Sequence, residues 1–172
     1  MNSIIVLAFP CCGKTDVVKS SEALFRSHVK TIVEVDCRNY TKEPGWADKY
    51  VDDLLKYVGK AEVIFGTLHI DVLTAIHKRG VPYTVIIPSQ AQFDDGRTRK
   101  LTKQQWVGRA YLSGSNVEDI LRVWDTLTNE NLLKACKPTM ILYLSYNNYI
   151  SDVMDKIYAM LTREPKVFAI EG

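Results

Sequence analysis

The sequence has no apolar run that approaches the roughly 20 consecutive residues needed to span a bilayer. Its first apolar run, residues 4–9, is too short for the core of a signal peptide, and no basic segment precedes it. Internal repeats and low-complexity linkers are missing as well. We therefore expect a globular, cytoplasmic protein without a membrane partner.

A strong charge of one sign is also missing. The 22 Lys and Arg residues nearly balance the 20 Asp and Glu residues, which leaves a formal charge of +2. This near balance argues against a broad basic field for nucleic acid. The four cysteines (Cys11, Cys12, Cys37 and Cys136) form no paired CxxC framework, and no His lies at zinc-finger spacing. We expect free, reduced thiols.

The chain is long enough for one domain with a full core, because 47% of its 172 residues are apolar. Apolar runs that are typical of strands alternate with helical patterns. Strands are expected at residues 4–9, 30–35, 63–67, 83–87 and 139–144. Helices are expected at residues 14–25, 46–58, 71–78, 106–112, 116–127 and 150–161. This alternation predicts an α/β fold with a five-stranded parallel sheet covered by helices on both faces, in a single domain of residues 1–172.

Ligands of such sheets bind beyond the carboxyl ends of the strands, so the residue types found there indicate function. The first expected strand is followed by Ala8-Phe9-Pro10-Cys11-Cys12-Gly13-Lys14-Thr15. This segment has the Walker A spacing, with Ala8 in place of the first glycine. Backbone N–H groups at the start of the next helix would surround a phosphate. Lys14 would reach the β- and γ-phosphates, and the Thr15 hydroxyl would ligate Mg²⁺. We therefore predict that Pro10, Cys11, Cys12, Gly13, Lys14 and Thr15 bind a nucleotide.

With this loop, the chain resembles P-loop nucleoside or nucleotide kinases, and in particular small phage deoxynucleoside monophosphate kinase-like proteins. The pattern continues in Asp36, in residues 63–69 and 81–88, and in the Arg-containing segment 106–111. The resemblance implies ATP and Mg²⁺ as cofactors, an acceptor site above the second and third strands, and a mobile lid at about residues 89–115. It also implies the host cytoplasm as the location if the protein is phage-encoded.

The acceptor site expected from this resemblance contains Asp36, Arg38, Thr67 and His69. Asp36 would orient the acceptor, although it could instead cap backbone amides at the start of a loop. Arg38 would neutralise an acceptor phosphate, or remain solvated. For His69 we favour a cap on the next helix. The third strand lacks the usual terminal Asp, and Asp71 is a candidate substitute.

The expected lid is rich in cations. Arg97, Arg99, Lys103 and Arg109 are its candidates for stabilising the transferred phosphoryl group. Arg109 is the preferred residue, because a helix would hold it toward the site. With Lys14 and Asp36 it forms the expected catalytic set. The alternative interpretation of this basic run is an exposed loop.

The leading hypothesis is phosphoryl transfer from ATP to a small nucleotide, with a deoxynucleoside monophosphate as the expected acceptor. One alternative is a kinase acting on a modified base or hydroxyl in DNA, with residues 97–103 on the strand backbone. Another is a nucleotide-binding regulator without activity. The sequence leaves the oligomeric state open, a homodimer included.

Overall fold

The computed structural model describes residues 2–15, 17–18, 32–89, 96–145 and 148–163. Its five strands are β1 (Ile4–Ala8), β2 (Ile32–Glu34), β3 (Val63–Thr67), β4 (Thr84–Pro88) and β5 (Met140–Leu144). All of the strand pairings are parallel. The five-stranded parallel α/β fold expected from the sequence is therefore confirmed, with strand positions close to those predicted.

The strand order is β2-β3-β1-β4-β5. The first strand lies in the middle, and the chain leaves it toward one edge before returning to the other side. Its neighbours are β3 and β4, so the carboxyl end of β1 is a point where the strand order reverses. This is where an open parallel sheet forms a crevice for ligands. The segment that begins at Phe9 leaves β1 at this position.

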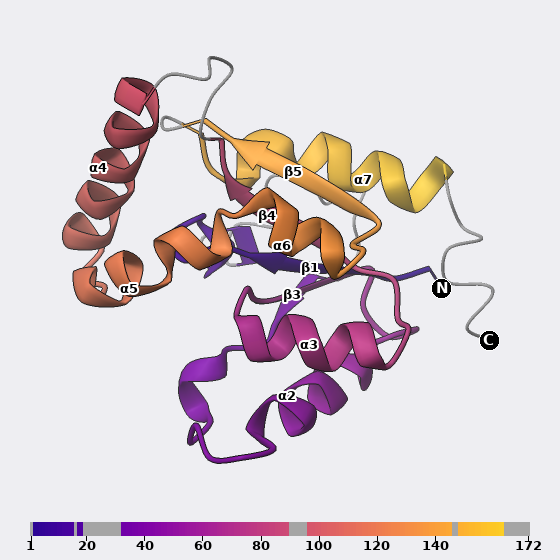
Figure 1. The fold of residues 1–172 in the computed structure, drawn as a ribbon. Coiled ribbons are helices and arrows are strands. Elements are labelled where there is room, and N and C mark those ends of the chain that lie inside the picture. The colour runs from indigo at the N-terminus through magenta and orange to yellow at the C-terminus, as the bar shows by residue number, and fades with distance from the viewer. Residues whose placement is uncertain (1, 16, 19–31, 90–95, 146–147, 164–172) are drawn as a thin grey trace.

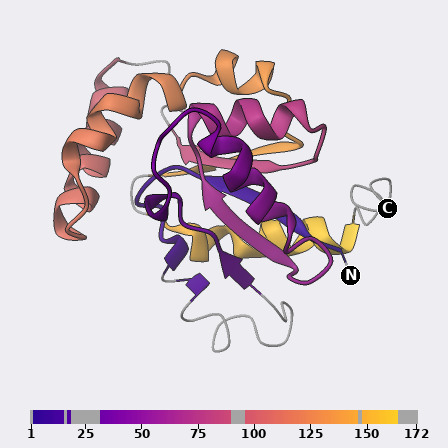
Figure 2. The same cartoon turned by 90° about the horizontal axis from the view of Figure 1, so that it is seen from below.

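Six α-helices lie within the described residues: α2 (Trp46–Leu55), α3 (Ile70–Lys78), α4 (Gly96–Leu112), α5 (Val117–Leu127), α6 (Glu130–Ala135) and α7 (Met154–Arg163). Two short 3-10 turns are η1 (Cys37–Asn39) and η2 (Ile150–Val153). A further helix begins at Lys14 and contains the described residues up to Val18. Figures 1 and 2 show α3 and α7 on opposite sides of the strands, while α4 and α5 lie at one end of the sheet.

The core explains why the strands read as continuous apolar runs. Every residue of β1 is buried, as are the first four residues of β3. Gly66 is required in β3 because a Cβ atom there would lie 2.9 Å from Leu7 Cδ2 and 3.1 Å from both Leu54 Cδ2 and the Tyr50 hydroxyl. That hydroxyl donates a hydrogen bond to Val35 O (2.5 Å) and accepts one from Thr67 N (2.8 Å). The closely packed tyrosine thus joins the ends of β2 and β3.

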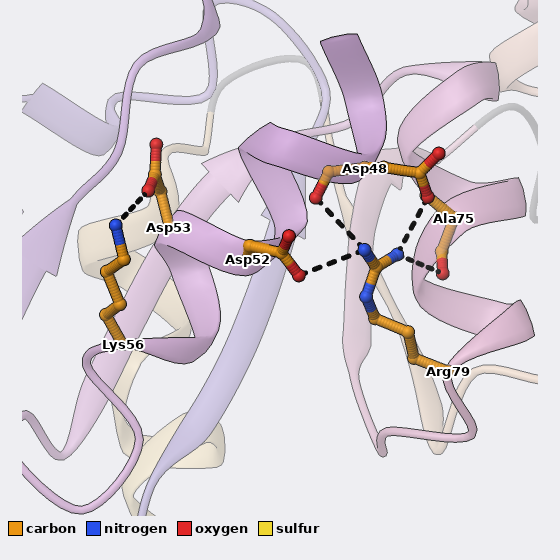
Figure 3. A network of polar contacts seen from close by, with 6 residues as sticks. All are labelled: Asp48, Asp52, Asp53, Lys56, Ala75 and Arg79. Atoms are coloured by element: carbon orange, nitrogen blue, oxygen red, sulfur yellow. Dashed lines mark hydrogen bonds and ion pairs between the residues drawn. The ribbon is translucent and has the colours of Figure 1, made fainter. Parts of the chain in front are cut away.

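Arg79, directly after α3, connects this helix to α2 (Figure 3). Its Nη1 donates to Asp48 Oδ1 at 3.0 Å and to Ala75 O at 3.2 Å. Its Nη2 donates to Asp52 Oδ1 at 3.0 Å and to Asp48 O at 3.1 Å. Burial alone would lower the pKa of Arg79, but the hydrogen bonds to Asp48 and Asp52 raise it. One guanidinium group therefore holds the two helices in register.

Several elements differ from the sequence expectations. The helix expected up to residue 58 ends at Leu55, and turns lead on to Gly59. The polar, basic run that we read as the start of an exposed lid is helical from Gly96 onward, so α4 is much longer than the helix expected at residues 106–112. The short helix α6 was not predicted. The expected cap at Asn116 is confirmed, since its side chain accepts from Glu118 N. Residues 19–25 of the first expected helix lie outside the described residues.

Among the described residues, no helix has both the length and the apolar character that a membrane crossing requires.

Candidate functional site

The loop between β1 and the following helix makes two left-handed steps. Cys11 has φ of 65° and Gly13 has φ of 91°. A side chain at Gly13 would also meet Tyr149, whose Cδ1 lies 3.2 Å from an ideal Cβ position. Gly13 is therefore needed for its backbone conformation and for close packing. Left-handed residues also occur in anion-binding nests, in which successive N–H groups point to one concave side.

The backbone N–H groups from Cys11 to Thr15 have no hydrogen-bond partner within the part of the chain that the structure describes. The Lys14 ammonium folds back across the loop and donates to Ala8 O at 3.4 Å. The structure thus combines open donors and a cation at the start of a helix. This combination fits a polyphosphate.

Thr15 faces a carboxylate that sequence reasoning missed. Its Oγ1 donates to Glu34 Oε1 at 2.9 Å, which connects the start of the helix to the end of β2. Glu34 is the one charged residue in the apolar run from Ile32 to Val35. This charged residue within an apolar run was the one feature of the sequence that could have pointed to Glu34. The feature is not specific, because polar residues are common near the ends of strands.

Aromatic side chains support the loop from beneath. Phe9 makes edge contacts with Trp106 and Trp124, with ring centroids 6.3 and 5.4 Å apart. Trp106, on α4, is fully buried and donates from its indole Nε1 to Pro10 O at 3.0 Å. This hydrogen bond fixes the loop at Pro10 to α4, a helix nearly 100 residues away in the sequence.

Arg109 lies beside the loop, one turn along α4 from Trp106. Its guanidinium carbon is 4.1 Å from the centroid of the Trp106 ring and 4.0 Å from that of Tyr149. Its Nη2 donates to Asn148 O at 2.5 Å. Burial lowers the pKa of Arg109, yet a guanidinium remains charged throughout the ordinary pH range. The structure therefore places a buried positive charge close to Cys12, which is one of the groups acting on it.

Cys12 is buried in the loop, with 1% of its surface exposed. Burial raises the pKa of its thiol to about 12, against weaker opposing effects of Lys14 and Arg109. The thiol therefore stays protonated and acts as a small apolar side chain. All four cysteines are free, as expected.

Asp36 and Arg38 are engaged with each other at the end of β2. The Asp36 carboxylate caps η1 by accepting from Arg38 N at 2.9 Å, and it also accepts from Arg38 Nε at 2.6 Å. Partial burial would raise the pKa of Asp36, but the bonds to Arg38 lower it, with a smaller contribution from Lys14. The capping alternative for Asp36 is thus observed, and the influence of Lys14 places Asp36 near the loop.

His69 caps α3 as favoured from the sequence, because its Nδ1 accepts from Asp71 N at 3.0 Å. Its ring also meets Trp46 edge-on, with centroids 4.9 Å apart. Burial lowers the pKa of His69, which suits the unprotonated nitrogen that the cap requires. Thr67 ends β3 and donates its N–H to the Tyr50 hydroxyl.

The expected lid cations are not all placed at the loop. Arg97 and Arg99 belong to α4, but their side chains lie outside the described residues. Lys103 is half-buried on the same helix. Of these four cations, the structure places Arg109 against the loop.

Comparisons with known proteins bear on the fold alone. No protein-family model matches the sequence, and no curated protein matches it either. The crystal structure of APE1195 is similar, with a TM-score of 0.51 over 95% of this chain and 97% of that chain. The two sequences are 13% identical. The similarity supports the α/β layout alone.

Proposed function

We propose that this protein binds ATP at the loop from Ala8 to Thr15 and transfers its γ-phosphoryl group to a small nucleotide. A single observation carries the proposal. The N–H groups from Cys11 to Thr15 have no partner among the described residues, and the Lys14 ammonium lies across the same loop. Polyphosphate oxygens would satisfy these donors together.

Lys14 would exchange partners when the nucleotide binds. Its ammonium would leave Ala8 O, a neutral acceptor at 3.4 Å, for the β- and γ-phosphate oxygens. A charge-assisted hydrogen bond of this kind is stronger than the bond it replaces. Lys14 would therefore hold the donor and offset charge as the γ-phosphoryl group leaves.

Thr15 would supply a hydroxyl ligand to Mg²⁺. The donor set fits, because the Thr15 hydroxyl and the Glu34 carboxylate are both hard oxygen groups. Among the described residues, no cluster of three or more His, Cys, Asp or Glu side chains is arranged to hold a metal by itself. When bound, the ion would offset the negative charge of the phosphates.

Arg109 would contribute positive charge from the side of α4. Its planar guanidinium is oriented by the Trp106 and Tyr149 rings, which limits the entropy lost when it contacts a phosphate. In this proposal the acceptor would lie above β2 and β3, near Asp36, Arg38, Thr67 and His69. Release of Arg38 from Asp36 would provide a cation for its phosphate.

The proposal is tested with labelled ATP and a panel of nucleoside monophosphates, together with calorimetry of ATP binding. We expect transfer to at least one acceptor, and we expect Lys14→Ala to reduce it by roughly 100-fold or more, since loss of one well-placed donor to a developing charge costs that much. Lys134→Ala is the matched control, because this lysine lies on α6 beside Glu130 and is mostly exposed. Equal loss in both variants, or unchanged transfer in Lys14→Ala, would contradict the proposal.

Two observations favour a second candidate, a nucleotide-binding regulator without transferase activity. The two charged acceptor candidates, Asp36 and Arg38, already bond to each other. β3 also ends at Thr67 rather than at a carboxylate. The same panel separates the candidates, because a regulator would bind ATP in the calorimeter and label no acceptor, including DNA.

A further inference from the structure

We propose that Glu34 is the carboxylate that positions Mg²⁺ at the phosphate loop, in place of the residue that β3 does not supply. This inference rests on the proposed function, since it names a further positioning residue of the same nucleotide site. It assigns a role to a side chain that the sequence analysis left among the residues of a strand. Its basis is the hydrogen bond between Glu34 and Thr15, which connects β2 to the residue expected to ligate the metal.

The direction of this hydrogen bond matters. Thr15 Oγ1 donates its only proton to Glu34 Oε1 at 2.9 Å. The two lone pairs of the hydroxyl oxygen are then left for other groups, and a cation requires lone pairs. Glu34 thereby fixes the hydroxyl in the orientation that suits a metal ligand. Loss of a partner that orients a metal ligand in this way typically lowers metal affinity by roughly 10–100-fold.

The two other carboxylates considered for this role, Asp36 and Asp71, have different partners. Asp36 accepts two hydrogen bonds from Arg38. Asp71, the substitute suggested by the sequence, lies in the first turn of α3 with its carboxylate 3.9 Å from His69 Nδ1, and 59% of its side chain is exposed. No contact joins either residue to Thr15 within the part of the chain that the structure describes. Among the residues described, Glu34 is therefore the carboxylate that a hydrogen bond joins to the loop.

Charge provides a second reason. Glu34 lies close enough to Arg38 to act on it, so the end of β2 carries both signs. A lone carboxylate near a triphosphate would oppose binding, because like charges repel. When Mg²⁺ is bound as well, the same carboxylate would favour binding of the nucleotide. Glu34 should thus have opposite effects on nucleotide affinity with and without the ion.

The test uses calorimetry on the wild type and Glu34→Gln. A non-hydrolysable ATP analogue is titrated into the protein in Mg²⁺ and in EDTA, and Mg²⁺ is titrated into the protein–analogue complex. The Gln side chain can still accept from Thr15 but carries no charge. We expect Glu34→Gln to raise the dissociation constant of Mg²⁺ for the protein–analogue complex by roughly 10–100-fold, the range for loss of an outer-sphere partner. In EDTA, we expect the analogue to bind the variant as tightly as the wild type or more tightly. Thermal unfolding checks that the variant is folded.

Asp71→Asn is the matched control, since it removes the carboxylate that the sequence suggested as the substitute. This variant should retain the Mg²⁺ affinity of the wild type. If Glu34→Gln left the Mg²⁺ affinity unchanged, or if Asp71→Asn lost more affinity than Glu34→Gln, the inference would be overturned, whereas analogue binding would still support the nucleotide site. If the wild type bound no analogue in either condition, the proposed function would fail and this inference with it.

Discussion

Gly66 shows at the scale of one residue how tightly the sheet and α2 are packed. A methyl group at this position would be within 2.9 Å of Leu7 and 3.1 Å of both Leu54 and the Tyr50 hydroxyl. We expect Gly66→Ala to lower the free energy of unfolding by about 1–3 kcal/mol, the usual cost of overpacking. Denaturant titration measures this change.

Gly108 is the matched control for that substitution. It lies inside α4, and a Cβ there would meet nothing within 4 Å. Gly108→Ala should stabilise the protein by up to about 1 kcal/mol, because alanine favours a helix. A neutral or stabilising Gly66→Ala would show that Leu7 and Leu54 can move aside.

The residues of the loop were predictable to different degrees. Gly13, Lys14 and Thr15 could be singled out from the sequence because their order and spacing form a short local pattern. Glu34 could not be found in this way, because its partner Thr15 is 19 positions away and meets it only through the fold. Arg109 was identified from its charge, but its position between two rings depends on Tyr149, which follows the last strand.

At the scale of elements, Arg79 is the contact that distinguishes the α2–α3 pair from two merely adjacent helices. We expect Arg79→Met to lower the free energy of unfolding by about 1 kcal/mol, since the charge is partly exposed and is screened by water. The loss should shrink at high salt. Urea titrations at low and high salt measure both effects.

Arg122→Met provides the comparison. Arg122 pairs with Asp119 along one face of α5, and 74% of its side chain is exposed. Its replacement should change stability by no more than a few tenths of a kcal/mol, about the value of such pairs. Equal losses of stability in the two variants would mean that the contacts of Arg79 between the helices stabilise the protein no more than the exposed pair of Arg122 does.

The elements that sequence analysis found have a clear pattern of apolar residues, and the elements that it missed do not. The first part of α4 is polar and basic, without an apolar stripe to mark it as a helix before Trp106. The helix α6 has six residues, too few to show a period, and it relies on a cap from Asn129. By contrast, β1 and β3 were predictable because burial on both faces forces a continuous apolar run.

At the scale of the whole molecule, Cys12 couples folding to pH. The folded state raises the pKa of its thiol from 9.0 to about 12. Between these values the unfolded chain loses the proton and the folded protein keeps it. The contribution of this thiol to stability is therefore fully present below pH 9 and is lost as the pH rises toward 12, with a slope that approaches about 1.4 kcal/mol per pH unit for one proton.

Unfolding measured across this range should show a weaker decline in Cys12→Ala than in the wild type. Val17→Ala serves as the control, because it removes a buried apolar group close in sequence without removing a titrating one. That variant should be less stable at every pH, with the slope of the wild type. Parallel curves for the wild type and Cys12→Ala would refute the coupling.

The strand order β2-β3-β1-β4-β5 was beyond the reach of the sequence, because each pairing joins segments distant in the chain. The sequence predicted that the strands are parallel, and that ligands would bind beyond their carboxyl ends. It could not predict which strand ends would be neighbours. The structure brings the end of β2 toward the loop after β1, and this proximity places Glu34 beside Thr15.

The Tyr50 hydroxyl has a mechanical consequence. It holds Val35 O and Thr67 N through a single oxygen atom, so the ends of β2 and β3 cannot slide past one another without breaking one of these bonds. The segments that continue from both strands, toward Asp36 and toward His69, are therefore anchored to the same side chain. A molecule that displaced one segment would also move the other, and the two segments would shift together.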